Sequence, residues 1–443
     1  MDIYITPLVY ITFALLASAG FSALATPRLN ALVQALMVLG GTGALAASAI
    51  YLLAPDAPTV LMIGLIFEMT TLAAFFLGLV GLGTMLTSVF AMGYLPRYAG
   101  VYSLRGVNTA SAFFVIGMCA TVLASSPASF LFFWEMMSVA AYFLVIADSS
   151  EDSMKAGLLY FIVTQIGFFC LACGYMLMAD GALFATWDLL RTNATLMSMP
   201  MLTLIFTLLF AGFGSKAGLV PLHQWLPYAH AQAPGHSSAL LSGAMLSVAL
   251  FGFLKSTSLF PGMLLDWAVM VIVVGLVSAV FGALHAAVEN DAKRLLAYSS
   301  IEHMGLRFSA VGVYFALPAV GMPGVALQAG LLVFIFFHVL NHLFFKAGLF
   351  MSVGAIISAT HTRDLDEMGG LARAWPAFSG IALLLCLAAA ALPPFGTFGA
   401  VIKMKGIIPD KKALFDIGAA GPLMGLFFAI PAIIIGLYLS DVR

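Results

Sequence analysis

Charged side chains are scarce in this sequence. Only 8% of its 443 residues are Asp, Glu, Lys or Arg, and 63% are hydrophobic, whereas a soluble domain carries about 25% charged residues. So few charges exclude a fold whose whole surface faces water. The net charge of −1 gives no electrostatic basis for binding nucleic acid. The composition therefore predicts a protein surrounded by lipid, with no nucleic-acid partner.

Cysteines are also few, and they form no metal or disulfide pattern. The four are Cys119, Cys170, Cys173 and Cys386, and each lies in an apolar run. Cys170 and Cys173 form a CxxC pair, but metal sites of this kind usually need a second pair. We interpret the cysteines as small packing residues. Nucleotide-binding loops, cluster-binding cysteines and haem motifs are missing too, so we expect no cofactor, no metal and no redox centre in this chain.

Long apolar runs predict an all-α polytopic membrane protein. Backbone groups in lipid must be bonded internally, which allows helices or closed barrels, and a barrel would show alternating segments of about 10 residues. A spanning helix needs about 20 apolar residues. The candidate spans are 3–25, 29–53, 60–93, 107–125, 128–147, 154–179, 199–220, 238–258, 267–288, 296–317, 324–357, 376–402 and 417–440. They predict roughly 13–14 transmembrane helices, whereas residues 180–198 are too polar to span.

Basic residues between the spans predict the orientation. Gaps after odd-numbered spans hold most of these residues, including Arg97, Arg105, Lys293 and Arg294. By the positive-inside rule these gaps are cytoplasmic, which places the N-terminus outside and the C-terminus inside. The first span lacks a basic segment before it, so we predict a retained helix rather than a cleaved signal. The expected location is the cytoplasmic (inner) membrane of a prokaryote.

Two predicted spans contain a proline break. Pro221 interrupts the seventh span, and Pro393-Pro394 interrupts the twelfth. Proline removes a helical hydrogen bond, and the freed groups are tolerated only inside a bundle or beside a water-filled cavity. Broken helices at corresponding positions predict two inverted repeats with a pathway between them. The expected domains are N-terminal helices at 1–106, a first bundle at 107–258, and a second bundle with a C-terminal helix at 259–443.

Ionisable residues within the spans mark a candidate pathway. A charge at the bilayer centre costs at least about 2.5–3.5 kcal/mol, so these residues must face a polar interior. The clearest are Glu135, which follows an aromatic run, and Lys216, which precedes Pro221. Burial disfavours a charged lysine and a nearby carboxylate favours it, so such a lysine can exchange a proton. The alternatives are a structural, hydrogen-bonded Glu135 and a Lys216 that snorkels to an interface.

His338, His342 and Lys346 follow one another at intervals of four residues, which places them on one helix face. Histidine exchanges protons near neutral pH, so we predict a proton wire that also includes His303; buried structural histidines are the alternative. A metal pair is disfavoured because Val339 stands where metal-binding helices of this kind carry Glu.

Lys255 and Lys403 complete the candidate pathway. Lys255 lies near a helix end, where a lysine can instead snorkel. Lys403 lies beyond the Pro393-Pro394 break, where it could end the pathway if the break were shifted.

Three ordered motifs resemble those of a known family. Residues 216–241 read Lys-Ala-Gly-Leu-Val-Pro-Leu-His-Gln-Trp-Leu-Pro-Tyr-Ala-His-Ala-Gln-Ala-Pro-Gly-His-Ser-Ser-Ala-Leu-Leu. Residues 289–305 read Glu-Asn-Asp-Ala-Lys-Arg-Leu-Leu-Ala-Tyr-Ser-Ser-Ile-Glu-His-Met-Gly, and residues 361–371 read His-Thr-Arg-Asp-Leu-Asp-Glu-Met-Gly-Gly-Leu. They are similar to motifs of the antiporter-like subunits of respiratory complex I, Mrp-type antiporters and group 4 membrane-bound NiFe hydrogenases, including formate hydrogenlyase. Residues 289–294 and 341–346 most resemble the hydrogenase branch.

The resemblance implies two inverted five-helix bundles around a polar axis. It implies that Glu135 is the carboxylate of the fifth helix, that Lys216 is the lysine of the broken seventh helix, and that His303 and His342 belong to the axis. This sequence departs from the family pattern at two positions. Ser247 stands where the eighth helix often carries a lysine, and Lys403 is displaced from the usual position after the twelfth-helix break.

The predicted function is that of a proton- or cation-translocating membrane subunit in a redox-driven complex of the hydrogenase or complex I type. The expected partners are other membrane subunits and a peripheral hydrogenase or dehydrogenase arm that carries the Fe–S, NiFe or flavin centres; protons or Na⁺ would be the ions moved. Two alternatives stay open. One is a Mrp-type Na⁺/H⁺ antiporter subunit, and the other is a membrane scaffold that conducts nothing.

Overall fold

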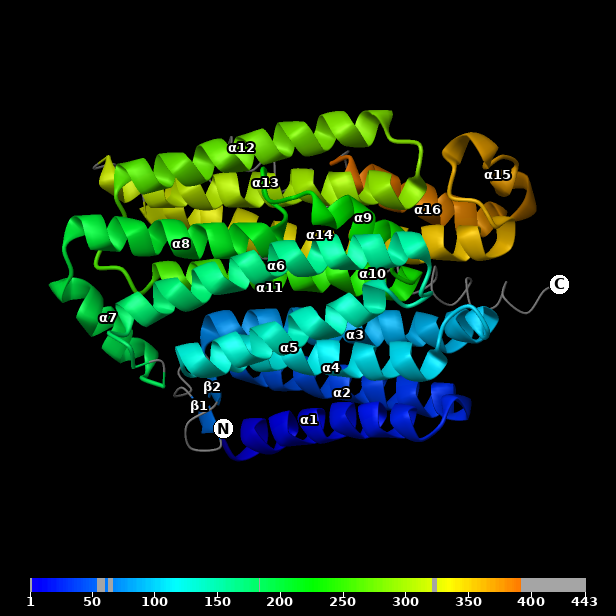
Figure 1. Ribbon diagram of the computed structural model, residues 1–443, viewed down its shortest axis with the longest axis horizontal. Coiled ribbons are helices and arrows are strands. Elements are labelled where there is room, and N and C mark those ends of the chain that lie inside the picture. Colours follow the sequence, from blue (N-terminus) through cyan, green and yellow to red (C-terminus); the bar gives the residue numbers. More distant parts are fainter. Residues whose placement is uncertain (1, 54–59, 63–66, 183, 321–324, 392–443) are drawn as a thin grey trace. The chain divides into compact units, whose positions relative to one another are not determined.

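Helices and one short hairpin are the regular elements of the described part of the chain. The computed structural model describes residues 2–53, 60–62, 67–182, 184–320 and 325–391 (Figure 1). Its longer helices are α1 (Asp2–Ala25), α2 (Asn30–Leu53), α3 (Thr71–Tyr94), α4 (Leu104–Leu123), α5 (Pro127–Val145), α6 (Glu151–Met178), α8 (Met199–Ala217), α11 (Leu246–Thr257), α12 (Leu265–Val288), α13 (Ala292–Ala319), α14 (Val325–Thr360) and α16 (Pro376–Ala389).

Shorter elements connect these helices. They are the antiparallel strands β1 (Val60–Met62) and β2 (Phe67–Met69), helices α7 (Trp187–Leu196), α9 (Trp225–Gln232), α10 (Gly235–Leu240) and α15 (Leu371–Ala374), and a π-helical segment at Leu241–Met245. Turns of 3-10 helix lie at Pro27–Leu29, Leu95–Tyr98 and Leu365–Glu367. The segment 180–198, predicted to be too polar to span, accordingly holds only the ten-residue helix α7.

Ten helices in the described ranges are long and apolar enough to cross a membrane. The predicted spans up to residue 357 match helices within a few residues, with one error. The span predicted at 60–93 is wrong at its start, because residues 60–62 pair with 67–69 as strands and α3 begins at Thr71. Thr70 explains this start, since its side chain accepts a hydrogen bond from the backbone N–H of Ala73 and caps the helix. The Pro393-Pro394 break and the span 417–440 lie outside the described residues.

The residues cluster into two compact units. Unit 1 comprises residues 1–237 and 244–262, and unit 2 comprises residues 238–243 and 263–443. In unit 1, α1 packs on α2, α2 on α3, α4 on α5 and α6 on α8 (Figure 1). In unit 2, α13 packs against both α12 and α14, and α14 packs on α16.

The break predicted at Pro221 is present. Helix α8 ends at Ala217, Gly218 adopts a φ of 75°, and the next helix, α9, begins only at Trp225. Gly218 is suited to this end because glycine reaches positive φ at little cost. Lys216 therefore lies in the last turn of α8, where the negative end of the helix dipole favours a cation.

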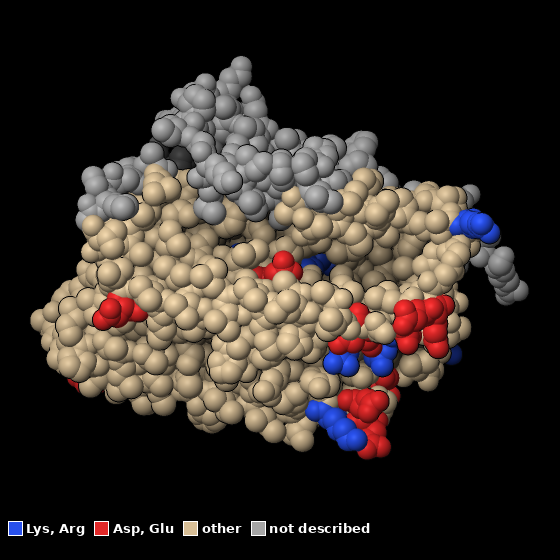
Figure 2. Space-filling model, turned by 90° about the horizontal axis from the view of Figure 1, so that it is seen from above, with Lys and Arg blue, Asp and Glu red and all other residues tan. Residues whose placement is uncertain are grey.

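Helix α13 differs from the other long helices. It has 28 residues, yet it is not among the ten candidate spans. Its sequence includes Lys293, Arg294, Glu302, His303 and Arg307, which lower its mean hydropathy. The face viewed in Figure 2 carries few charged side chains.

Candidate functional site

Lys216 is enclosed in unit 1 by hydroxyl and aromatic groups. Its side chain is 1% exposed, and its amine donates to Ser138 Oγ at 2.7 Å and to Tyr160 OH at 2.9 Å. The amine also lies 5.0 Å from the ring centre of Tyr160 and 5.8 Å from that of Trp134. Cations are attracted to aromatic faces at such distances. Lys216 therefore does not snorkel to an interface, and that alternative is wrong.

The directions of these hydrogen bonds follow from the neighbouring contacts. Ser138 donates its hydroxyl proton to the carbonyl of Trp134 at 2.8 Å, and Tyr160 donates its own to the carbonyl of Ser138 at 3.2 Å. Each hydroxyl has a single proton, so each can only accept from Lys216. The amine must consequently donate twice, which a neutral amine and a charged ammonium can both do.

Glu135 lies on α5, one helical turn before Ser138. It is half-buried, and one of its carboxylate oxygens accepts a hydrogen bond from the side chain of Gln165 on α6. The other oxygen is buried and has no hydrogen-bond partner within the described part of the chain. Glu135 is close enough to interact electrostatically with Lys216, but the two do not form an ion pair. Ser138, one turn after Glu135 on α5, is the residue that accepts a hydrogen bond from the amine of Lys216.

Glu135 also lines a groove in unit 1. The groove has a volume of about 990 Å³ and is lined mainly by apolar side chains of α4 and α5, such as Phe113, Phe132 and Phe143. Arg105 lies at its wall as well. Glu135 thus borders a cavity, whereas Lys216 is enclosed.

Lys255 occupies a different place in unit 1. Its amine donates to the carbonyl of Ala124 at 3.0 Å and lies 4.8 Å from the ring centre of Trp187. The Trp187 indole donates to the same carbonyl at 2.9 Å. Ala124 is the C-cap residue of α4, so Lys255 stabilises a helix end. The structure does not bring Lys255 to the Lys216 site.

Three histidines form a cluster in unit 2. The ring centres of His303 and His338 are 5.2 Å apart, those of His303 and His342 are 5.6 Å apart, and those of His338 and His342 are 6.5 Å apart. All three side chains are at most 3% exposed. Both ring nitrogens of His338 and of His342, and Nδ1 of His303, have no hydrogen-bond partner within the described residues. The structure therefore brings His303, His338 and His342 together, while their role as a proton wire stays a prediction.

Lys346 lies next to this cluster and is fully buried. Its amine donates to the carbonyl of Leu296 at 2.9 Å and to the hydroxyl of Ser299, both on α13. Within the described ranges, no group of three or more His, Cys, Asp or Glu side chains is arranged to hold a metal ion. The cluster is instead a set of polar groups that can accept and donate protons.

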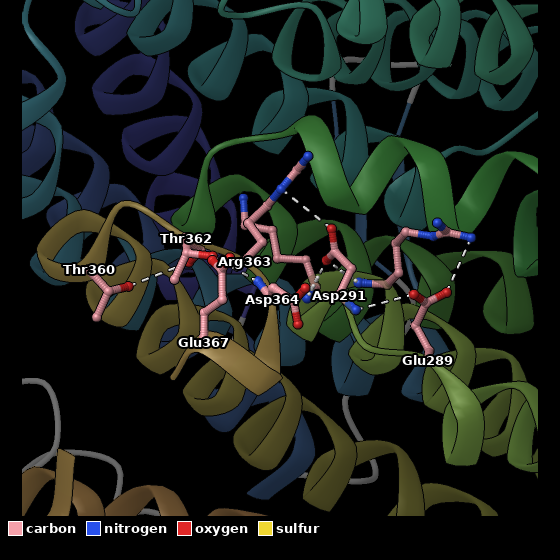
Figure 3. Close-up of polar contacts among 9 residues, drawn as sticks. Glu289, Asp291, Thr360, Thr362, Arg363, Asp364 and Glu367 are labelled. Atoms are coloured by element: carbon pink, nitrogen blue, oxygen red, sulfur yellow. Dashed lines mark hydrogen bonds and ion pairs between the residues drawn. The ribbon is translucent and has the colours of Figure 1, made fainter. Parts of the chain in front are cut away.

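Two loops of unit 2 hold the ends of α13 and α14 together (Figure 3). Asp291 and Asp364 form an antiparallel backbone bridge, and Arg363 Nε lies 3.4 Å from Asp291 Oδ2. Asp291 Oδ1 also accepts from the backbone N–H of Lys293 and of Arg294, which caps α13. The loop before α13 holds the first residues of the second motif, and the loop after α14 holds most of the third motif, so residues of both motifs position the two helices that carry the histidines.

Two residues singled out in the sequence lie apart from these sites or outside the described part of the chain. Lys403 lies outside the described residues. Ser247, which stands at the position of an expected lysine, is fully buried in α11.

Four polar residues at these sites were not predicted from the sequence: Ser138, Tyr160, Gln165 and Ser299. The available signal was the placement of Ser138 one helical turn from Glu135, and of Ser299 one turn from Glu302.

A family model described as the transmembrane part of NADH:quinone oxidoreductase and Mrp antiporters matches residues 124–405. The chain belongs to this family. It is accordingly a multi-pass integral membrane protein. The match includes Glu135, Lys216 and the histidine cluster, and confirms the resemblance inferred from the three motifs.

Two proteins of Escherichia coli are similar to most of this chain. Hydrogenase-4 component B of Escherichia coli is 37% identical over 358 residues, which cover 78% of this chain and 51% of that protein. Formate hydrogenlyase subunit 3 of the same organism is 32% identical over 320 residues, covering 71% of this chain and 50% of that protein. The chain thus spans about half the length of these curated relatives.

The fold is also similar to that of a solved family structure. A chain of the Mrp complex from Dietzia sp. DQ12-45-1b superposes with a TM-score of 0.76 at 20% identity, covering 98% of this chain and 79% of that one. This likeness concerns the fold alone.

Proposed function

We propose that this chain is the proton-translocating membrane subunit of a redox-driven complex of the hydrogenase or formate hydrogenlyase type, or of a complex I-like assembly. The observation that carries the proposal is the buried Lys216, whose amine is bonded to two hydroxyls and lies within electrostatic range of Glu135. A buried lysine without an ion pair is costly as a structural element, and it is suited to accept and release a proton.

The proposed mechanism begins at Glu135. A change in the partner arm would alter the interaction between Glu135 and Lys216, and Lys216 would then release or take up a proton. In unit 2, the clustered rings of His303, His338 and His342 would pass protons through water, because an imidazole can accept at one nitrogen and donate at the other. Lys346 and Lys403 would extend this pathway, and the chain itself would supply no redox centre.

The proposal also includes the internal repeats of the chain and its orientation in the membrane. Two inverted five-helix repeats, with broken seventh and twelfth helices, would form within the domains 107–258 and 259–443. The N-terminus would lie outside and the C-terminus inside the cytoplasmic membrane. Cysteine accessibility at Arg97→Cys and Asp188→Cys tests the orientation, since the two positions should react from opposite sides.

The partners can be identified by purifying the tagged chain in mild detergent and analysing the copurifying proteins by mass spectrometry. A NiFe hydrogenase subunit with Fe–S proteins would support the hydrogenase form of the proposal. A quinone-linked dehydrogenase arm would indicate a complex I-like assembly. Small membrane subunits alone would overturn the redox-driven proposal.

A Mrp-type antiporter subunit is the second candidate, favoured by the family description and by the fold of the Dietzia Mrp complex. A non-conducting scaffold is the third candidate. Replacing Lys216 by Ala should abolish proton transport into vesicles that contain the whole assembly, while Lys155→Ala, at an exposed i,i+4 ion pair, should leave it intact. Unchanged transport in Lys216→Ala, with loss of assembly when the chain is deleted, would establish the scaffold.

A further inference from the structure

Unit 2 repeats the arrangement found around Lys216. In unit 1 a buried lysine on α8 donates to Ser138, and Glu135 lies one turn from that serine on α5. In unit 2 the buried Lys346 on α14 donates to Ser299, and Glu302 lies one turn from that serine on α13. Residues three apart lie on the same helix face, so each carboxylate is placed beside the lysine without pairing with it.

Among the residues that the structure describes, the half-buried Glu302 carboxylate is not held by a hydrogen bond or an ion pair. It is nevertheless close enough to Lys346 for each to affect the charge of the other. A half-buried carboxylate that anchors a fold is normally hydrogen-bonded. Glu302 therefore has the properties of a group that exchanges protons rather than of an anchor.

Lys346 connects Glu302 with the histidine cluster. His342, one turn earlier on α14, and His303 on α13 are both within electrostatic range of its amine. Arg307 and Cys386 are also within this range. Lys346 itself is held in place by the carbonyl of Leu296 and by Ser299, which leaves one of the three N–H donors of its charged form for a further acceptor.

We propose that Glu302, Ser299 and Lys346 form a second proton-exchange site, in which Glu302 takes the proton from Lys346 and passes it out of the helix bundle. The ammonium of Lys346 loses one proton and becomes an amine, and the carboxylate of Glu302 gains that proton and becomes a carboxylic acid. Ser299 positions the amine during this step. Glu302 then releases the proton to water, and the amine of Lys346 takes up a new proton from the histidine cluster. This inference rests on the proposed proton-translocating function.

The test measures proton transport in vesicles that contain the purified complete assembly, using an imposed membrane potential and a trapped pH-sensitive dye. Glu302→Gln should lower the transport rate by at least about tenfold, because proton transfer by a positioned group typically contributes about 10²–10⁴-fold. Glu302→Asp should restore part of the rate, since it keeps a carboxylate. Glu151→Gln, the same substitution at the exposed ion pair with Lys155 in unit 1, should leave transport unchanged.

A double substitution distinguishes proton exchange from a structural role. If Glu302 acts through Lys346, Glu302→Gln should cause no further loss in a Lys346→Gln background. Ser299→Ala should lower transport and Ser299→Thr should retain it. Equal losses in Glu302→Asp and Glu302→Gln, or an additive effect in the double variant, would overturn the inference.

Lys216→Ala separates this inference from the proposed function. If Lys216→Ala abolishes transport and Glu302→Gln does not change it, the second site is wrong and the proposed function stands. If neither substitution changes transport, the proposed function itself fails. The amount of assembled complex, measured by gel filtration, normalises every rate, so that a variant that folds poorly is compared per assembled molecule.

Discussion

The amine of Lys216 lies 2.7 Å from Ser138 Oγ. Helix α5, which carries Ser138, also carries Glu135 one turn earlier. The lysine is therefore held by a neutral hydroxyl while a carboxylate lies in reach of its charge. An ion pair would fix the charged form of the lysine, whereas hydroxyl acceptors accommodate both the amine and the ammonium. This relationship makes a transferable proton chemically reasonable at Lys216.

Tyr160→Phe should lower transport several-fold. The substitution keeps the aromatic ring but removes the hydroxyl that accepts from Lys216 at 2.9 Å. A hydrogen bond to a charged group contributes about 1.5–3 kcal/mol, so the position of the amine should become less defined. Transport into vesicles, per assembled complex, measures the effect.

Tyr175→Phe is the matched control, since Tyr175 is also buried on α6 but bonds to Ser256 at 2.6 Å. It should lower thermal stability by a similar amount and leave transport per molecule unchanged. Equal losses of transport in both variants would mean that Tyr160 acts only through stability.

Lys255→Met should destabilise the protein without blocking transport. The amine of Lys255 supports the end of α4 through the carbonyl of Ala124 and lies over the Trp187 ring. A cation–π contact contributes about 0.5–1 kcal/mol at exposed sites, and the lost hydrogen bond adds to this. The melting temperature in detergent should fall, whereas Lys155→Met at the surface should not change it. A loss of transport as large as that of Lys216→Ala would instead place Lys255 in the pathway.

Gly167→Ala should separate α6 from α8 and disturb the Lys216 site. A Cβ at Gly167 would overlap Ser215 Oγ and lie 3.1 Å from the carbonyl oxygen of Gly212. Overpacking of this kind typically costs about 1–3 kcal/mol. Both the melting temperature and transport should fall. Gly262→Ala is the control, because a Cβ there meets no atom within 4 Å; similar losses in both variants would contradict the explanation by close packing.

Asp291→Ala should loosen the junction of α13 and α14 shown in Figure 3. It removes the cap of α13, which is typically stabilising by about 0.5–2 kcal/mol, together with the ion pair to Arg363. Asp291→Asn should keep most of the stability, since asparagine caps helices equally well. Thermal unfolding of the assembled protein measures both. Equal destabilisation by Ala and Asn would show that the ion pair, rather than the cap, stabilises this junction.

The sequence by itself determined the class of the protein and most of its helices. With 8% charged residues and long apolar runs, no solvent-exposed fold is available, and the length of each run sets the length of each helix. The start of the span predicted at 60–93 was the exception, because short apolar runs such as 60–62 fit a strand as well as a helix, and the Thr70 side chain caps α3 at its start. The spacing of His338, His342 and Lys346 was also sufficient to predict their common face, since helical periodicity is local.

Only the tertiary structure decided which groups the ionisable residues meet. Ser138 and Tyr160 are 78 and 56 residues from Lys216 in the sequence, and Ala124 is 131 residues from Lys255. Such partners depend on which helices pack together and at what height, and close approach at residues such as Gly167 sets both. The local sequence therefore identified the residues that can carry protons, while helix packing determined that Lys216 and Lys346 each bond to a serine with a glutamate one turn away.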